Sequence, residues 1–356
     1  MQEKRWGILF IVIYTSLLIA VGVTVYLVDP YFHFHKPLKG MSYSIEKEEY
    51  VNDGISKNFD YNAMITGTSV TLGFNVQEAN EIFNKEFVRL TFQGEGFKRI
   101  NENLEVAIKN NPELDMVIRG IDTLWFISDP GWMGYEEYPL YLYDDIWWND
   151  VKYLYNKDVF WGDVIPQIIR SLKGESAYHF DMEGRGDRRT NIQQAINAYK
   201  RSEKQDSIWT DAEEQERFEM LEKNLNQNVI NIIEKNQNVT FYLFFPPYSI
   251  CWWDSLNQVG PERIKQAVEM EEMAIEKILQ YENVHLFSFF NNYEIVCDLR
   301  NYTDSVHFTD NVSLEILKCM ERGEYELTKD NYRDYLQEIR DFYCNYDYDS
   351  IFISNE

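Results

Sequence analysis

The feature that most constrains this chain is a run of 23 residues without a charge, from Trp6 to Val28. As a helix that rises about 1.5 Å per residue, such a run spans roughly 35 Å and crosses a bilayer core with some tilt. A surface helix of a soluble domain would carry a polar face, and none is visible along this run. We therefore expect residues 1–28 to form a cytoplasmic stub and a transmembrane anchor.

The charges beside this run predict how the chain is oriented. Lys4 and Arg5 precede it, whereas Asp29 and Pro30 follow it. Positive charge before the span favours an N-terminus inside the cell and a large domain outside the cytoplasm. A cleaved signal peptide is the alternative, but the run is longer than a typical signal core, and no clear small-residue cleavage site precedes Asp29. We expect a single-pass membrane protein.

Composition limits the partners and the folding class. The formal net charge is −25, which repels nucleic-acid phosphates and disfavours nucleic-acid binding. Aromatic residues make up 16% of the chain, more than a disordered chain would carry. No C-x-x-C pair is present, which disfavours zinc knuckles and thioredoxin-type chemistry. Disulfides are permitted outside the cytoplasm, and the sequence leaves their formation open. The four cysteines are Cys251, Cys297, Cys319 and Cys344.

Beyond the anchor, short apolar runs alternate with helical patterns and predict an α/β domain with a mostly parallel sheet covered on both faces. We expect a connector at 29–60, the α/β domain at 61–324 with a helical and aromatic insertion at about 123–235, and a C-terminal tail or helix at 325–356. The predicted strands are Ala63–Gly67, Phe87–Phe92, Asp115–Ile121, Val239–Phe245 and Val284–Phe290. The predicted helices are Val76–Lys85, Phe97–Asn110, Glu213–Lys235, Pro261–Gln280, one beginning at Val312–Met320, and Asp330–Tyr343.

Three residues could form a catalytic triad. Ser69 directly follows the first predicted strand and precedes a helix, where amide groups could stabilise an oxyanion. Asp304 and His307 follow the last predicted strand, and their spacing lets the carboxylate reach the imidazole on one short loop. Working groups of α/β sheets lie at the carboxyl ends of strands. Each motif alone is weak, because Gly-Thr-Ser is commonly a turn or a helix cap.

These residues resemble the SGNH (GDSL-like) hydrolase superfamily. Gly67-Thr68-Ser69 matches its serine block, and Asp304 to His307 matches its acid–base block. The resemblance implies a three-layer α/β/α, SGNH/flavodoxin-like fold and a serine esterase or acyltransferase without a cofactor or metal. Gly94, in TFQGEGF, matches the glycine that gives an amide to the oxyanion hole.

The third block departs from the family. The family supplies an asparagine donor there, but this chain reads Gly120-Ile121-Asp122. An ionised Asp122 cannot donate a hydrogen bond. It would have to be protonated, or a donor would come from Asn75 or from the Ser69 amide.

The layout is similar to membrane-anchored SGNH-like proteins of bacteria, such as the teichoic acid D-alanyl transfer protein and alginate-type O-acetyltransferases. That branch implies a substrate that is a cell-surface polysaccharide or other acylated polymer, and a membrane-embedded acyl donor protein as a partner. In FFPPYS, Tyr248 could stack on sugar rings together with Trp252 and Trp253, or the segment could be a rigid turn.

Two rival functions remain open. The domain could be a catalytically inactive module that binds or assembles cell-envelope polymers, which the Asp122 departure favours. A weaker alternative is a metal-dependent hydrolase that uses His33, His35 and acidic residues, although no ligand spacing in the sequence demands it. These two histidines more commonly form part of an interfacial aromatic cluster.

Overall fold

The computed structural model describes residues 2–43, 47–134, 139–175, 190–260 and 262–353. The chain separates into two compact units. The first comprises Met1–Asp60, Val106–Asn111 and Tyr135–Asp181. The second comprises Tyr61–Glu105, Pro112–Gly134 and Met182–Glu356.

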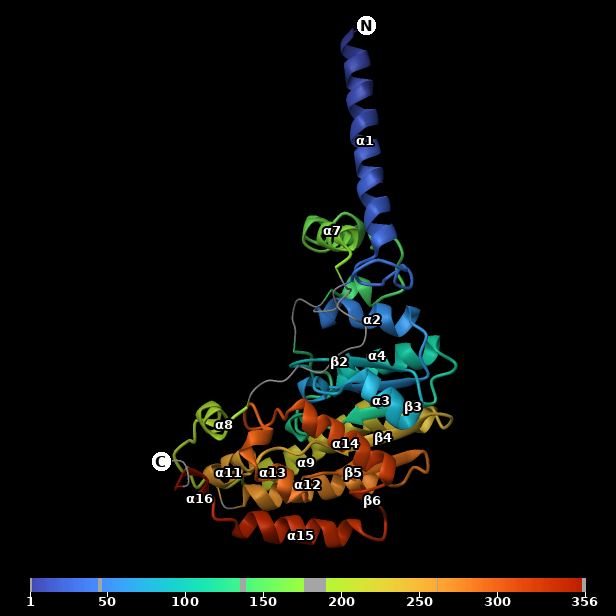
Figure 1. Ribbon diagram of the computed structural model, residues 1–356. Helices are drawn as coiled ribbons and strands as arrows, with labels where there is room; N and C mark the ends of the chain where they lie inside the picture. The colour runs from blue at the N-terminus through green and yellow to red at the C-terminus, as the bar shows by residue number, and fades with distance from the viewer. Residues whose placement is uncertain (1, 44–46, 135–138, 176–189, 261, 354–356) are drawn as a thin grey trace. The chain divides into compact units, whose positions relative to one another are not determined.

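The second unit is built on one six-stranded sheet with the order β2-β1-β3-β4-β5-β6 (Figure 1). Strands β1 to β5 are parallel, and β6 runs antiparallel to β5. Because β1 lies between β2 and β3, the strand order reverses beside β1, and ligands bind at such a reversal in open α/β sheets. The strands are β1 Ala63–Gly67, β2 Phe87–Thr91, β3 Met116–Gly120, β4 Thr240–Phe245, β5 Val284–Ser288 and β6 Glu326–Leu327.

The strand sequences explain why this sheet is buried. All five residues of β1 and all five of β3 are buried, as expected for central strands of a parallel sheet that is covered on both faces. The register of the sheet aligns the carboxyl ends of four strands: Gly67 of β1 pairs with Thr91 of β2, and Gly120 of β3 pairs with Phe244 of β4. The carboxyl ends of these strands therefore meet at one edge.

The helices of the second unit surround its sheet and are labelled in Figure 1. Helix α14 packs against α3, and α12 packs against α9, α11 and α15. The longer helices are α3 Val76–Phe83, α4 Phe97–Asn110, α8 Ile192–Tyr199, α9 Asp211–Leu225, α11 Ile250–Val259, α12 Arg263–Ile278, α14 Asp310–Arg322 and α15 Tyr332–Asn345. The shorter ones are η1 Ser69–Thr71, η2 Thr123–Trp125, η5 Asn226–Ile230, α10 Asn231–Lys235, α13 Tyr293–Val296, η6 Leu299–Asn301 and α16 Ser350–Ile353.

The first unit begins with α1, which is long and apolar enough over Lys4–Val28 to cross a membrane. Buried aromatic side chains, among them Tyr31, Phe32 and Tyr153, form its core. Its helices are α1 Gln2–Val28, α2 Glu48–Asn58, η3 Leu140–Leu142, α5 Val151–Leu154, α6 Lys157–Val159, η4 Phe160–Val164 and α7 Ile165–Lys173, and the last turn of α4 also belongs to it.

The structure differs from the sequence-based domain boundaries at three places. Residues 29–60, expected as a connector, contain α2 and belong to the first unit. The expected insertion at 123–235 is divided, because Tyr135–Asp181 joins the first unit and the remainder joins the second. The tail at 325–356 is integral to the second unit: it supplies β6, which pairs with β5, and α15, which packs on α12.

Candidate active site

The candidate site lies at the carboxyl ends of the parallel strands of the second unit. Ser69 stands two residues after β1, and Asp122 stands two residues after β3. Gly94 and Tyr248 each stand three residues after β2 and β4, and His307 lies in the loop that follows β5 and η6. Five strands thus deliver the predicted side chains to one edge of the sheet, where α/β folds bind their ligands.

Ser69, His307 and Asp304 form a continuous chain of hydrogen bonds. The Ser69 Oγ lies 2.7 Å from Nε2 of His307. The opposite ring nitrogen, Nδ1, lies 2.7 Å from Oδ2 of Asp304. Since Nδ1–H donates to the carboxylate, Nε2 is left with a lone pair that faces the serine hydroxyl. This is the arrangement that a serine nucleophile and its general base require.

The electrostatics keep Asp304 ionised. Burial acts to raise the pKa of Asp304, but the hydrogen bond and electrostatic attraction of the His307 ring, together with two backbone amides, outweigh burial and hold the pKa below its usual value. The amides of Val306 and His307 donate to Oδ1 at 2.9 and 2.8 Å. The side chains of His307 and Asp304 are 24% and 35% exposed, so a substrate can reach the imidazole.

The loop that carries the acid and the base is fixed at both ends. A β-bridge between Tyr302 and Phe308 closes it, and the Tyr302 hydroxyl donates to the Pro247 carbonyl at 2.8 Å. The Ser249 amide and hydroxyl both donate to the Ser305 carbonyl, at 3.0 and 2.9 Å. The segment after β4 is therefore a rigid support for this loop.

Asp122 is a buried acceptor of hydrogen bonds. Its Oδ2 accepts from the Thr68 hydroxyl at 2.7 Å, and its Oδ1 accepts from the Tyr248 hydroxyl and from the Leu124 amide. Burial raises the pKa of Asp122, against the lowering effect of these donors and of His307. Asp122 thus ties the ends of β1, β3 and β4 together, and both of its oxygens are engaged.

Two other predicted oxyanion residues have distinct local roles. Gly94 lies in a turn with a φ of 68°, a left-handed conformation that favours glycine. Asn75 caps α3: its Oδ1 accepts from the amides of Gln77 at 2.8 Å and Glu78 at 3.3 Å. The side-chain carbonyl of Asn75 is occupied by this cap, and its amide is the group left for donation.

The burial of Tyr248 and Trp253 favours the rigid-turn alternative for this segment over stacking on a ligand. Tyr248 is 0% exposed and Trp253 is 1% exposed. Tyr248 packs against Trp252, and Trp253 stacks on Tyr343 with ring centroids 3.7 Å apart. Side chains enclosed in this way support the site from behind, as in the rigid-turn interpretation of this segment.

Thr68 and Ser249 are supporting residues that sequence reasoning did not identify. Thr68 holds Asp122, and Ser249 holds the loop that carries Asp304 and His307. Each is a hydroxyl residue placed within a few positions of a strand's carboxyl end. That placement is the signal that could have singled them out.

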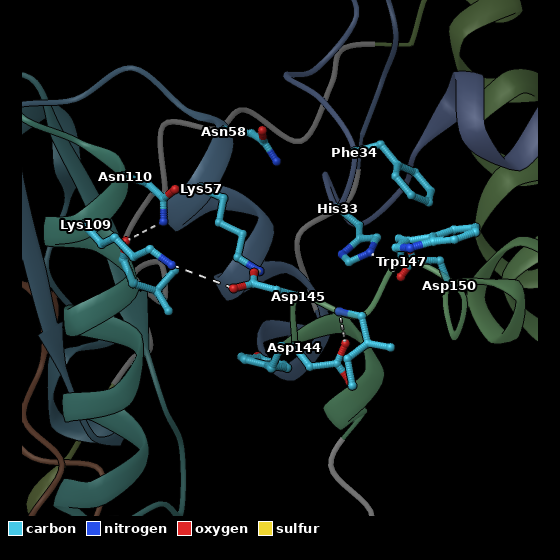
Figure 2. A pocket seen from close by; sticks show the side chains of 13 residues that line it. His33, Phe34, Lys57, Asn58, Lys109, Asn110, Asp144, Asp145, Trp147 and Asp150 are labelled. Atoms are coloured by element: carbon cyan, nitrogen blue, oxygen red, sulfur yellow. Dashed lines mark hydrogen bonds and ion pairs between the residues drawn. The ribbon is translucent and has the colours of Figure 1, made fainter.

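The structure has two cavities of interest, one in each unit. In the second unit, a cavity of about 200 Å³ is lined mainly by apolar side chains, including Leu124, Trp252, Met270 and Phe290. In the first unit, a cavity of about 470 Å³ is lined by charged and aromatic side chains (Figure 2). Its lining includes Lys57, Lys109, Asp144 and Asp145, and its aromatic members include Tyr143 and Trp147.

The histidines proposed as alternative metal ligands have other partners. His33 Nε2 lies 2.9 Å from Asp150, and its ring packs on Phe34. Both ring nitrogens of His35 face backbone carbonyls, those of Lys36 and Tyr26. Among the described residues, no group of three or more His, Cys, Asp or Glu side chains is arranged to hold a metal ion. The four cysteines are free thiols.

Comparison with known proteins adds one distant likeness. No protein-family model matches this chain, and no curated protein matches it. A solved structure from Streptococcus pneumonia, named provisionally as a platelet activating factor, is similar at 13% identity, with 82% of this chain and 92% of that chain covered and a TM-score of 0.34. At that TM-score the likeness carries no argument about fold or activity.

Proposed function

We propose that this chain is a membrane-anchored serine enzyme of the SGNH type, which hydrolyses or transfers an acyl ester on a cell-surface polymer. The observation that carries the proposal is the hydrogen-bonded chain from Ser69 through His307 to Asp304, with both contacts at 2.7 Å. The supporting observation is its position at the strand ends beside the reversal of strand order.

The geometry defines a role for each group. Ser69 Oγ attacks the ester carbonyl while its proton passes to Nε2 of His307. Asp304 holds the imidazole through Nδ1 and stabilises the positive charge that the ring acquires. The imidazolium then returns the proton to the leaving alkoxide, and an acyl-serine remains. Water as the second acceptor completes hydrolysis, whereas a polymer hydroxyl completes transfer.

Backbone amides supply the oxyanion hole in this proposal. Ser69 opens the short helix η1, and Gly94 occupies the turn after the neighbouring strand β2. Amides at these two positions can donate to a developing oxyanion without any side chain. Asp122 acts as a positioning residue instead, since its oxygens accept from Thr68 and Tyr248.

The strand order supports the finer description of the fold. The order 2-1-3-4-5 of the parallel strands is the flavodoxin-like doubly wound order. Right-handed crossovers in that order direct α3 to one face of the sheet and α4, α9 and α12 to the other. Helix α14 packs against α3 and therefore joins the face of α3. These placements support the three-layer α/β/α arrangement implied by the SGNH resemblance of Gly67-Thr68-Ser69 and the later acid–base block.

The anchor supports the choice of substrate. Helix α1 is long and apolar enough to cross a membrane, and Lys4 and Arg5 before it favour a second unit outside the cytoplasm. A tethered acyl-transfer enzyme is confined to the membrane surface, which suits an acylated envelope polysaccharide of a bacterium. A membrane-embedded acyl donor protein is the partner that a transferase of this layout requires.

One observation favours a second candidate, a non-catalytic module that binds envelope polymers. The position at which the family places an asparagine donor holds Asp122, whose two oxygens are already used as acceptors. If the amides of Ser69 and Gly94 do not form an oxyanion hole, the hydrogen-bonded chain would be a relic of a catalytic ancestor.

Hydrolysis of a small aryl ester by the full-length protein in detergent separates the two candidates. We expect measurable turnover that Ser69→Ala and His307→Ala both abolish. Ser313→Ala, a buried serine on α14 outside the hydrogen-bonded chain, is the matched control and should retain activity. Equal rates in the wild type and in Ser69→Ala would contradict catalysis at this site.

A further inference from the structure

The first unit exposes an unusual number of large apolar side chains. Eight of them lie between residues 146 and 173, whereas the described residues outside this segment and α1 expose five. Soluble proteins rarely leave such a concentration of apolar surface in water. The eight are Ile146, Trp147, Trp148, Val151, Tyr155, Trp161, Ile169 and Leu172, with exposed fractions from 38% to 83%.

Helix α7 has a polarity that is inverted for a helix facing water. Its Leu172 is 83% exposed and Ile169 is 46% exposed, whereas Gln167 is 2% exposed. Segment 146–173 also differs from the acidic remainder in charge, with four basic and three acidic residues in a chain of net charge −25. Exposed apolar side chains with flanking basic residues are typical of helices that lie in a membrane interface.

This segment packs against the last two turns of α1. A Cβ added to Gly22 would lie 2.9 Å from the hydroxyl oxygen of Tyr155, so the tyrosine ring lies directly against the helix at this glycine. Gly22, Val25 and Val28 form the buried face of the helix end. Gly22 lies about 9 Å along the axis before Val28. If α1 spans the bilayer, Tyr155 lies at the depth where Tyr and Trp gather at a membrane boundary.

Polar contacts fix the segment to the residues that follow α1. The Tyr153 hydroxyl donates to Asp29 at 2.9 Å, and His33 lies 2.9 Å from Asp150. Figure 2 shows His33 and Asp150 together beside Trp147. In Figure 1, α1 runs nearly vertically in the plane of the picture, and α7 is seen nearly end-on beside its lower end. Helix α7 therefore runs across the axis of α1, along the plane of a membrane that α1 crosses.

We infer that residues 146–173 form a second membrane contact, in which the exposed aromatic and aliphatic side chains enter the interfacial layer of the lipid bilayer around α1. The occupant of this surface is lipid, because the surface continues directly from the membrane-spanning face of α1. The inference rests on the anchoring part of the proposed function and is independent of the serine chemistry.

Site-directed spin labelling of the full chain in nanodiscs of phosphatidylcholine and phosphatidylglycerol tests this inference. The parent protein carries Cys344→Ser, because Cys344 is the exposed native thiol among the four cysteines. Labels are introduced singly by Leu172→Cys on α7, Leu17→Cys in the middle of α1 and Ile208→Cys in the second unit. These residues are 83%, 61% and 68% exposed, so none of the substitutions removes a core side chain.

The readout is the collision rate of each label with oxygen, which concentrates in lipid, and with a water-soluble nickel chelate. We expect the label at position 172 to show a ratio of oxygen to nickel accessibility that is several-fold higher than at 208 and lower than at 17, which lies in the bilayer core. A label at 172 that matches 208 while 17 stays in lipid would overturn the inference and leave the anchor intact. A label at 172 that is shielded from both reagents would also overturn it, in favour of a protein partner. Nickel access at 17 would instead refute the membrane anchor.

Discussion

The buried carboxyl of Glu271 gives the second unit a pH-dependent stability that can be measured without any substrate. Glu271 lies within α12, and its Oε1 accepts from the hydroxyls of Ser288 at 3.1 Å and Tyr335 at 2.6 Å. Burial raises the pKa of Glu271 to about 7, against the lowering effect of these two hydrogen bonds. The folded protein therefore holds a proton on Glu271 that the unfolded chain releases at lower pH.

The sign and the magnitude follow from this difference. Because the pKa is higher in the folded state, the stabilising contribution is fully present below pH 4.5 and is lost as the pH rises through about 7. At about 1.4 kcal/mol per pH unit, the difference between the two pKa values corresponds to about 3 kcal/mol. Glutamine keeps the shape of the protonated side chain but cannot ionise. Glu271→Gln should remove this part of the pH dependence.

Urea unfolding of wild-type protein and Glu271→Gln, repeated from pH 5 to pH 8, measures the effect. The difference in unfolding free energy between the two proteins should move by about 2–3 kcal/mol in favour of the variant as the pH rises. Other titrating groups cancel in this difference. Two curves that stay parallel across this range would refute the assignment of a raised pKa to Glu271.

Three further perturbations test the account. Asp304→Asn should lower the rate of ester hydrolysis by about 10³–10⁴-fold, because the amide cannot hold the imidazole in the tautomer that leaves Nε2 unprotonated. Initial rates measure this loss, and circular dichroism checks that the variant stays folded. Tyr248→Phe removes a donor to the buried carboxyl of Asp122 and should cost about 1–3 kcal/mol in urea unfolding; an unchanged midpoint would contradict that role. Arg119→Met should stabilise the protein by about 1–4 kcal/mol, because Arg119 is buried and its Nε and Nη2 atoms have no partner among the described residues. A lower midpoint of thermal unfolding in the variant would contradict this prediction.

Local patterns predicted the core of the second unit well. The strand Ala63–Gly67 and the helix Phe97–Asn110 have the bounds that the sequence indicated. Both are short, strongly patterned segments whose ends are marked by glycine or by polar residues. Short apolar runs alternate along the chain with segments whose apolar residues have helical spacing. This local information is sufficient to predict an α/β fold with a mostly parallel sheet.

Features that depend on contacts between distant residues could not be predicted. Helix α2 includes Gly54, which is unfavourable in a helix interior. It is required there because a Cβ would lie 2.2 Å from the Tyr31 carbonyl oxygen. The assignment of Tyr135–Asp181 to the first unit likewise depends on contacts such as Tyr153 with Asp29, 124 residues apart in sequence. No local pattern encodes such a pairing.

Part of the candidate site could be predicted from local patterns. Ser69 and the pair of Asp304 and His307 stand beside strand ends that the sequence marks clearly, and the structure brings their side chains within 2.7 Å of one another in turn. The burial and the hydrogen-bond partners of Asp122 and Tyr248 could not be predicted, because they arise only when β1, β3 and β4 come together.

The measurement that tests the central claim most directly is labelling of the full-length protein with a fluorophosphonate, followed by peptide mass analysis. An activated serine reacts with this reagent, whereas an ordinary hydroxyl does not. The account predicts one adduct, on Ser69, that disappears in His307→Ala and stays on Ser69 in the Ser313→Ala control. A folded protein that acquires no adduct at Ser69, or one that labels equally with and without His307, would contradict it.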